Sequence, residues 1–125
     1  MTITITFSER PTLADHPIDG PYVRDVWAAI IGPGATLLLE RSRQLRLVHG
    51  DPATVPIGDV ADWLGVMPAK VRLMCGRLET FRLATWDGST LTTVSHVRGL
   101  SPEQVRRAGA IPRRIHAALS AVGVA

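Results

Sequence analysis

The sequence predicts a mostly α-helical α+β domain with one small β-hairpin and extra helices toward both ends of the chain. Apolar residues recur at three- and four-residue spacing along most of the chain, which is typical of amphipathic helices. Two β-prone runs flank Asp87-Gly88, a pair that favours a tight hairpin turn. The length of 125 residues suits a single core. We therefore expect one domain over residues 22–125, preceded by an extended arm over residues 1–21.

The arm begins with a run in which threonine alternates with larger apolar residues. Ile3, Ile5 and Phe7 follow this period of two, which predicts a short strand. The rest of the arm is rich in proline, aspartate and glycine, as loops are. The strand is expected to pair with a sheet edge, either in its own chain or in a partner.

Two helices are expected next, over residues 22–31 and 33–48. Pro21 stands where the start of a helix tolerates proline, and Gly32-Pro33-Gly34 separates the two helices. The residues of the second helix that are expected to face the core are Leu37, Leu38, Leu45 and Val48.

A short extended piece at residues 55–57 is expected to lead into a helix over residues 59–64 and another over about 67–81. Gly65 stands between these helices, where a positive φ favours glycine. Ala61 is small enough for the second helix to cross the first. The apolar residues at the facing positions are Val60, Leu64, Val66, Val71 and Met74.

The segment from Ile57 to Gly76 resembles the helix-turn-helix signature, and with the hairpin it is similar to a winged helix-turn-helix domain. This resemblance implies a helix-turn-helix at about residues 57–81, a wing at about 82–97 and C-terminal helices at about 101–123. Residues 22–121 also resemble an uncharacterised group of winged-helix proteins from actinobacteria and their phages. The matching pieces are Gly32–Leu39, Leu78–Ala84 and Ile115–Leu119. The second resemblance supports the same fold and implies no defined activity.

The winged-helix resemblance implies that the helix from Met67 to Phe81 enters the major groove of double-stranded DNA. Arg72 is the main candidate for reading a base, because arginine forms paired hydrogen bonds with guanine. Lysine and arginine side chains around it are expected to contact phosphates. The other candidate DNA-binding residues are Lys70, Leu73, Arg77, Thr80, Arg82 and Arg98.

The charges of the chain are unevenly distributed. Residues 1–65 carry a net charge of −3, whereas residues 66–125 carry nine basic and three acidic side chains, a net charge of +6. A basic half favours an anionic partner such as DNA. The alternative explanation is an arginine-rich surface that faces only solvent. The C-terminal helix with Arg113 and Arg114 is open to the same two interpretations, and to a role in dimer formation.

These features predict a small DNA-binding protein, sequence-specific or general, that regulates transcription. A homodimer formed through the arm or the C-terminal helix is expected. The alternative is a protein-interaction module of phage origin on the same scaffold, without DNA binding. An exposed Leu73, an acidic hairpin tip at Asp87 and the strand-like arm favour this alternative.

The sequence shows no pattern typical of an enzyme, and we expect no catalysis, cofactor or metal. The four histidines are scattered, without a carboxylate or cysteine at the spacing of metal ligands. Cys75, the single cysteine, falls on an apolar helix stripe and is expected to be buried and unreactive. No apolar run suits a membrane span, and the N-terminus lacks a signal-peptide pattern. A soluble cytoplasmic protein with no membrane contact is therefore expected.

Overall fold

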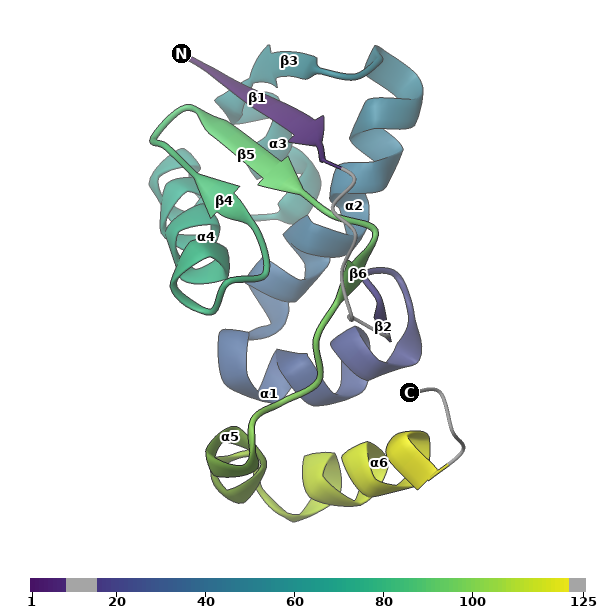
Figure 1. Ribbon diagram of the computed structural model, residues 1–125. Coiled ribbons are helices and arrows are strands. Elements are labelled where there is room, and N and C mark those ends of the chain that lie inside the picture. The colour runs from purple at the N-terminus through teal and green to yellow at the C-terminus, as the bar shows by residue number, and fades with distance from the viewer. Residues whose placement is uncertain (9–15, 122–125) are drawn as a thin grey trace.

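The computed structural model describes residues 1–8 and 16–121. It shows an α/β fold in which helices are interleaved with a four-stranded mixed sheet (Figure 1). The strands are β1 (Thr2–Phe7), β3 (Ala53–Pro56), β4 (Thr85–Trp86) and β5 (Thr90–Thr93). Their order across the sheet is β3-β1-β5-β4, with β1 antiparallel to β3 and parallel to β5.

This topology shows that the predicted winged helix-turn-helix fold, and the mostly helical fold class, are wrong. The hairpin β4–β5 does not stand alone as a wing, because β1 lies between β3 and β5. Ile5 pairs with Ala53 on one side and with Leu91 on the other. Ile3 and Ile5 are fully buried, so pairing inside the sheet removes both from water. The predicted strand of the arm is present, but it lies in the middle of the sheet.

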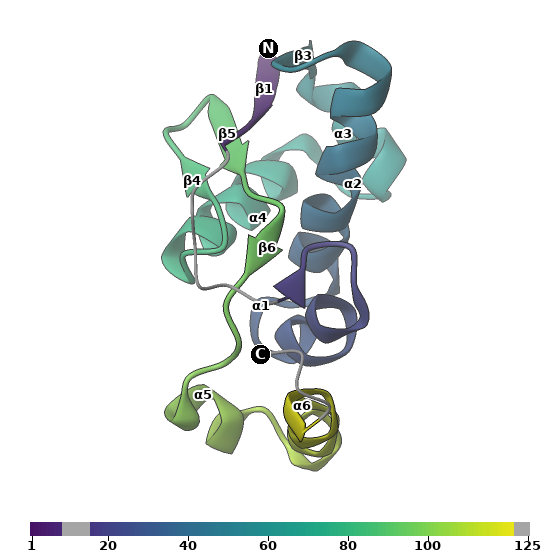
Figure 2. The same cartoon turned by 45° about the vertical axis from the view of Figure 1, so that its right-hand side comes forward.

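The two faces of the sheet differ in polarity. Helices α2 (Pro33–His49), α3 (Ile57–Leu64) and α4 (Pro68–Thr80) lie on one side of it (Figures 1 and 2). The strand residues that are buried toward these helices include Ile3, Ile5, Val55 and Leu91. The alternate positions are exposed or half-buried and carry threonine, including Thr4, Thr54 and Thr92. This alternation is typical of a sheet with one solvated face.

The helix before α2 starts with an unusual turn. Residues 23–27 form η1 (Val23–Trp27), a π-helical turn that continues into α1 (Ala28–Ile31). Gly32, with a φ of 88°, ends α1 and precedes Pro33 at the start of α2. The last turn of α2 projects from the core, since Leu47, Val48 and His49 are all exposed. Val48 is 76 % exposed, so the prediction that it faces the core is wrong.

The end of the molecule opposite β3 holds the remaining elements (Figures 1 and 2). β2 (His16–Pro17) pairs with β6 (His96–Val97), and α5 (Pro102–Arg107) leads into α6 (Ala110–Ala121). α6 packs against η1 and α5. None of the helices in the described part of the chain has the length and apolarity that a membrane span requires.

Candidate nucleic-acid interface

Helix α4 is held in place by the turn that precedes it and by its apolar side. Gly65 ends α3 with a φ of 72°, and the Val66 amide donates to the Ala61 carbonyl at 3.0 Å. This left-handed turn reverses the chain at low steric cost, as glycine allows. Pro68 then starts α4, where its missing N–H costs no helix hydrogen bond. The residues that α4 buries are Val71, Met74, Cys75 and Leu78.

The opposite side of α4 carries most of the candidate DNA-binding residues. Lys70, Arg72, Leu73, Arg77 and Thr80 are all exposed. The Thr80 hydroxyl donates to the Gly76 carbonyl at 3.0 Å, one turn earlier in the same helix. Leu73 is 68 % exposed and adds an apolar side chain to this charged surface. The structure therefore brings five predicted residues together on one surface.

The cations of α4 point to two sides. The guanidinium of Arg72 contacts the sulfur of Met1, at the start of β1. Lys70 and Arg77 instead line a groove between α4 and the turn that joins α1 to α2. Nη1 of Arg77 donates to the Ile31 carbonyl in that turn at 3.4 Å. The exposed surface of α4 thus has a sheet side with Arg72 and a groove side with Lys70 and Arg77.

The groove depends on a glycine at the first turn of α2. A Cβ atom on Gly34 would lie 2.6 Å from the Met74 sulfur, so the missing side chain allows α2 and α4 to approach. In the sequence, Gly32-Pro33-Gly34 indicates only a break between two helices. The paired glycines were the available signal for this close approach, but they do not indicate which element packs against the turn.

The other two predicted cations follow α4. Arg82 is exposed and adopts a φ of 60°, which is uncommon for a residue with a side chain. Arg98 is exposed, yet its guanidinium binds other parts of the chain. It donates to the Phe81 carbonyl at 3.1 Å, lies 3.4 Å from the Gln104 side chain and stacks over Trp27. Arg98 therefore joins the end of α4 to α5.

The tip of the hairpin is anionic. Asp87 accepts hydrogen bonds from the Thr90 amide at 2.7 Å and the Ser89 amide at 2.9 Å. These bonds, that from Thr90 first, lower the pKa of Asp87 below its ordinary value. The carboxylate is exposed and keeps its charge at neutral pH, so the tip would repel phosphate.

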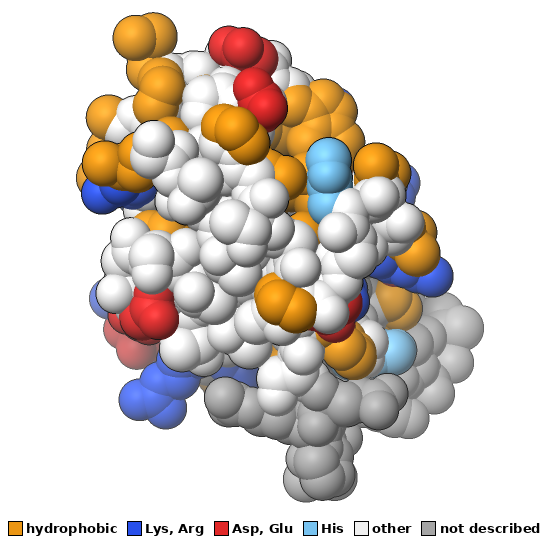
Figure 3. Space-filling view, turned by 90° about the horizontal axis from the view of Figure 1, so that it is seen from above, with side chains coloured by type: hydrophobic (Ala, Val, Ile, Leu, Met, Phe, Trp, Pro, Cys, Tyr) orange, Lys and Arg blue, Asp and Glu red, His pale blue; other side chains and the backbone are white. Residues whose placement is uncertain are grey.

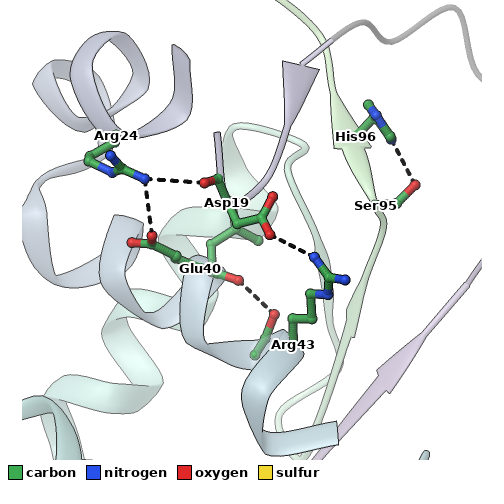
Figure 4. A network of polar contacts seen from close by, with 8 residues as sticks. Asp19, Arg24, Glu40, Arg43, Ser95 and His96 are labelled. Carbon is green, nitrogen blue, oxygen red and sulfur yellow. Dashed lines mark hydrogen bonds and ion pairs between the residues drawn. The ribbon is translucent and has the colours of Figure 1, made fainter. Parts of the chain in front are cut away.

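The arginines of α2 contrast with those of α4. Arg43 pairs with Asp19 at 2.7 Å, and Arg24 of η1 reaches both Glu40 and the Asp19 carbonyl (Figure 4). Arg46 lies 3.7 Å from Asp51. Within residues 1–8 and 16–121, no carboxylate lies within ion-pair distance of Lys70, Arg72 or Arg77. Positive charge is therefore uncompensated on α4 and largely compensated on α2.

Cys75 and the histidines are the remaining candidates that the sequence offers. Cys75 is buried, as predicted, and burial raises the pKa of its thiol to about 12. Sequence reasoning did not foresee that Tyr22 lies between His16 and His116. In the described ranges, no three side chains of the metal-binding types come together.

Comparison with protein-family models, with curated proteins and with solved structures finds no match to this chain. The resemblance to the actinobacterial and phage group therefore stays a prediction. Because the winged-helix fold is wrong, any argument for DNA binding now depends on the surface of α4 itself.

Proposed function

We propose that this protein binds double-stranded DNA through the exposed side of α4. The observation that carries the proposal is the set of exposed cations on this helix, Lys70, Arg72 and Arg77, that have no carboxylate partner among the described residues. By contrast, the exposed residues Arg24, Arg43 and Arg107 each form an ion pair with a carboxylate. Uncompensated cations on one surface attract the phosphates of DNA and give most of the affinity for it.

The shape of α4 also supports the proposal. Its 13 residues give a helix about 20 Å long. A helix of this kind fits the major groove, which is about 12 Å wide. Arg72 lies in the first half of the helix, where its guanidinium can reach a base edge, and small exposed residues such as Ala69 allow close approach. Regulation of transcription and formation of a homodimer stay predictions.

The test compares two arginines that differ in their surroundings. Arg72→Gln and Arg43→Gln each remove one exposed positive charge, the first from α4 and the second from an ion pair on α2. We expect Arg72→Gln to weaken binding of a labelled genomic duplex pool about tenfold, which is within the range for one base or phosphate contact. Arg43→Gln should bind as the wild type does. Equal affinities of the two variants in fluorescence anisotropy would contradict the proposal.

A second candidate function is binding of a protein partner, which apolar surface near the C-terminal end of α2 favours. An apolar groove of about 270 Å³ lies between α2 and α3, lined by Leu45, Val48 and Trp63 among others. Hydrophobic side chains lie beside acidic ones and a histidine when the molecule is seen from this end (Figure 3). Large exposed apolar patches often mark protein interfaces. The arm no longer supports this function, because β1 is paired on both edges.

A further inference from the structure

We infer that the groove between α4 and the α1–α2 turn, here called the α4 groove, holds one sugar-phosphate unit of the DNA backbone. This inference rests on the proposed DNA binding and assigns a part of it to residues on the groove side of α4. Lys70 and Arg77 bind the phosphate, and Leu73 contacts the sugar. The α4 groove thus binds the DNA backbone. Arg72 lies outside the groove, on the sheet side of α4.

The size and lining of the α4 groove suit such a unit. The groove has a volume of about 380 Å³, within the range of roughly 300–1,000 Å³ that is common for ligand pockets. Lys70 and Arg77 are seven residues apart on α4, so both lie on the same side of the helix. Leu73 lies between them. The complete lining is Ile31, Gly32, Pro33, Gly34, Ala35, Lys70, Leu73, Met74 and Arg77.

The charges of the α4 groove favour an anion. Its described lining contains two cations and no carboxylate. Arg77 uses one N–H on the Ile31 carbonyl, and the 3.4 Å distance indicates a weak bond. A guanidinium carries five N–H donors, so Arg77 keeps donors for a phosphate oxygen. The ammonium of Lys70 adds a second, more mobile charge.

The apolar part of the lining explains the exposure of Leu73. Leu73 is 68 % exposed between two cations. Contact of its apolar side chain with water brings no favourable free energy. The carbon face of a deoxyribose next to a bound phosphate would cover it. Gly34 keeps the groove narrow, because its missing side chain lets the α2 turn approach the Met74 sulfur.

An acidic peptide would also be attracted to these cations, but the surroundings favour DNA. The α4 groove is continuous with the rest of the exposed side of α4, which carries Arg72 as a further cation without a carboxylate partner in the described chain. Cations on two sides of one helix suit the two phosphate backbones that flank a major groove better than a single acidic side chain. Contacts of this kind set the position of a protein on the duplex.

The test uses the double variant Lys70→Gln/Arg77→Gln and a matched control. Arg24→Gln/Arg43→Gln also removes two exposed positive charges, but from η1 and α2. The affinity for a labelled duplex is measured by anisotropy over a range of salt concentrations. Each lost phosphate contact lowers the slope of log affinity against log salt by about 0.9. We expect the groove variant to lose about one unit of slope and at least tenfold in affinity at low salt.

Other variants and ligands separate the possible outcomes. Leu73→Ala should weaken binding severalfold without changing the salt slope, because it removes no charge. If the wild type binds DNA and the groove variant matches the Arg24→Gln/Arg43→Gln control, the inference is wrong while the proposed function stands. If the wild type binds no duplex, both are wrong. An oligoglutamate peptide that displaces the duplex from the wild type at equal charge concentration would also overturn the assignment to a backbone phosphate.

Discussion

Tyr22 contacts three separate segments through its buried hydroxyl group and its ring. Its Oη accepts a hydrogen bond from the Leu100 amide at 2.8 Å and lies 2.6 Å from Nδ1 of His116. Its ring stacks on that of His16, with 3.7 Å between the centroids. Because Oη accepts from Leu100, its own hydrogen is available for the contact with His116. Tyr22 therefore connects β2, the start of α5 and α6.

Replacing this hydroxyl tests its contribution to stability. Tyr22→Phe leaves the buried Leu100 amide without its partner, so we expect the free energy of unfolding to fall by about 1–3 kcal/mol. Urea unfolding measures the change. His116→Ala, which leaves the bond from Leu100 in place, should cost less. A Tyr22→Phe protein as stable as the wild type would show that the hydroxyl contributes nothing.

Two buried acids predict how stability changes at alkaline pH. Burial raises the pKa of the Cys75 thiol to about 12 and raises that of Tyr22 above its ordinary value of 10.0. Both groups are neutral in the fold, whereas the unfolded chain releases the thiol proton above about pH 9. Stability should be complete below pH 9 and decrease as the pH rises toward 12. Melting curves between pH 7 and 11 should show this decline, and Cys75→Ala should delay its onset toward pH 10.

The end of α4 contains a residue in a strained conformation. The Leu83 amide donates to the Leu78 carbonyl and the Arg82 amide to the Glu79 carbonyl, both at 2.9 Å. This pair of bonds is the Schellman motif, in which glycine usually takes the left-handed position. Arg82 takes it here with a φ of 60°. Strain of this kind often accompanies a functional side chain.

Substitution of Arg82 separates the conformation from the charge. Arg82→Gly should raise the free energy of unfolding by about 1 kcal/mol, because the left-handed conformation no longer strains a side chain. The same variant should bind DNA more weakly if Arg82 contacts a phosphate. Arg82→Lys keeps both the strain and the charge, so it should resemble the wild type in both measurements. A less stable Arg82→Gly protein would refute the account of the turn.

Elements formed by local interactions were predictable from the sequence. Gly65 and the apolar stripe of α4 depend on residues within a few turns, and the structure shows both where they were expected. The position of β1 was not predictable in this way. Thr4 pairs with Thr90, far along the chain, and periodicity within one strand does not reveal its neighbours. The hairpin therefore appeared to be a complete wing, although it is the outer part of a larger sheet.

Only the part of the candidate site that depends on helical spacing was predictable from the sequence. Helical spacing places Lys70, Leu73 and Arg77 on one side of α4, which the structure shows. The second wall of the α4 groove comes from residues 31–35, whose contact with α4 is a matter of tertiary packing. Arg98 was expected to bind phosphate, but its contacts with Phe81 and Trp27 come from elements distant in sequence.

At the scale of the whole molecule, the net charge changes sign between the N-terminal and the C-terminal half of the sequence. The N-terminal half is acidic overall, and two of the three arginines on α2 form ion pairs. The C-terminal half carries +6, and the cations of α4 have no carboxylate partner within the described ranges. The molecule thus presents a cationic surface on α4. This distribution would orient the protein on DNA before any close contact forms.

The most direct test of DNA binding is the salt dependence of the affinity of the wild-type protein for a labelled duplex. Lys70 and Arg77 share one phosphate, and Arg72 adds a second phosphate contact where it binds the backbone rather than a base. We therefore expect micromolar or tighter binding at low salt and a slope of log affinity against log salt of roughly −1 to −2. An affinity that does not change with salt, or no binding at low salt, would contradict the account and direct attention to a protein partner.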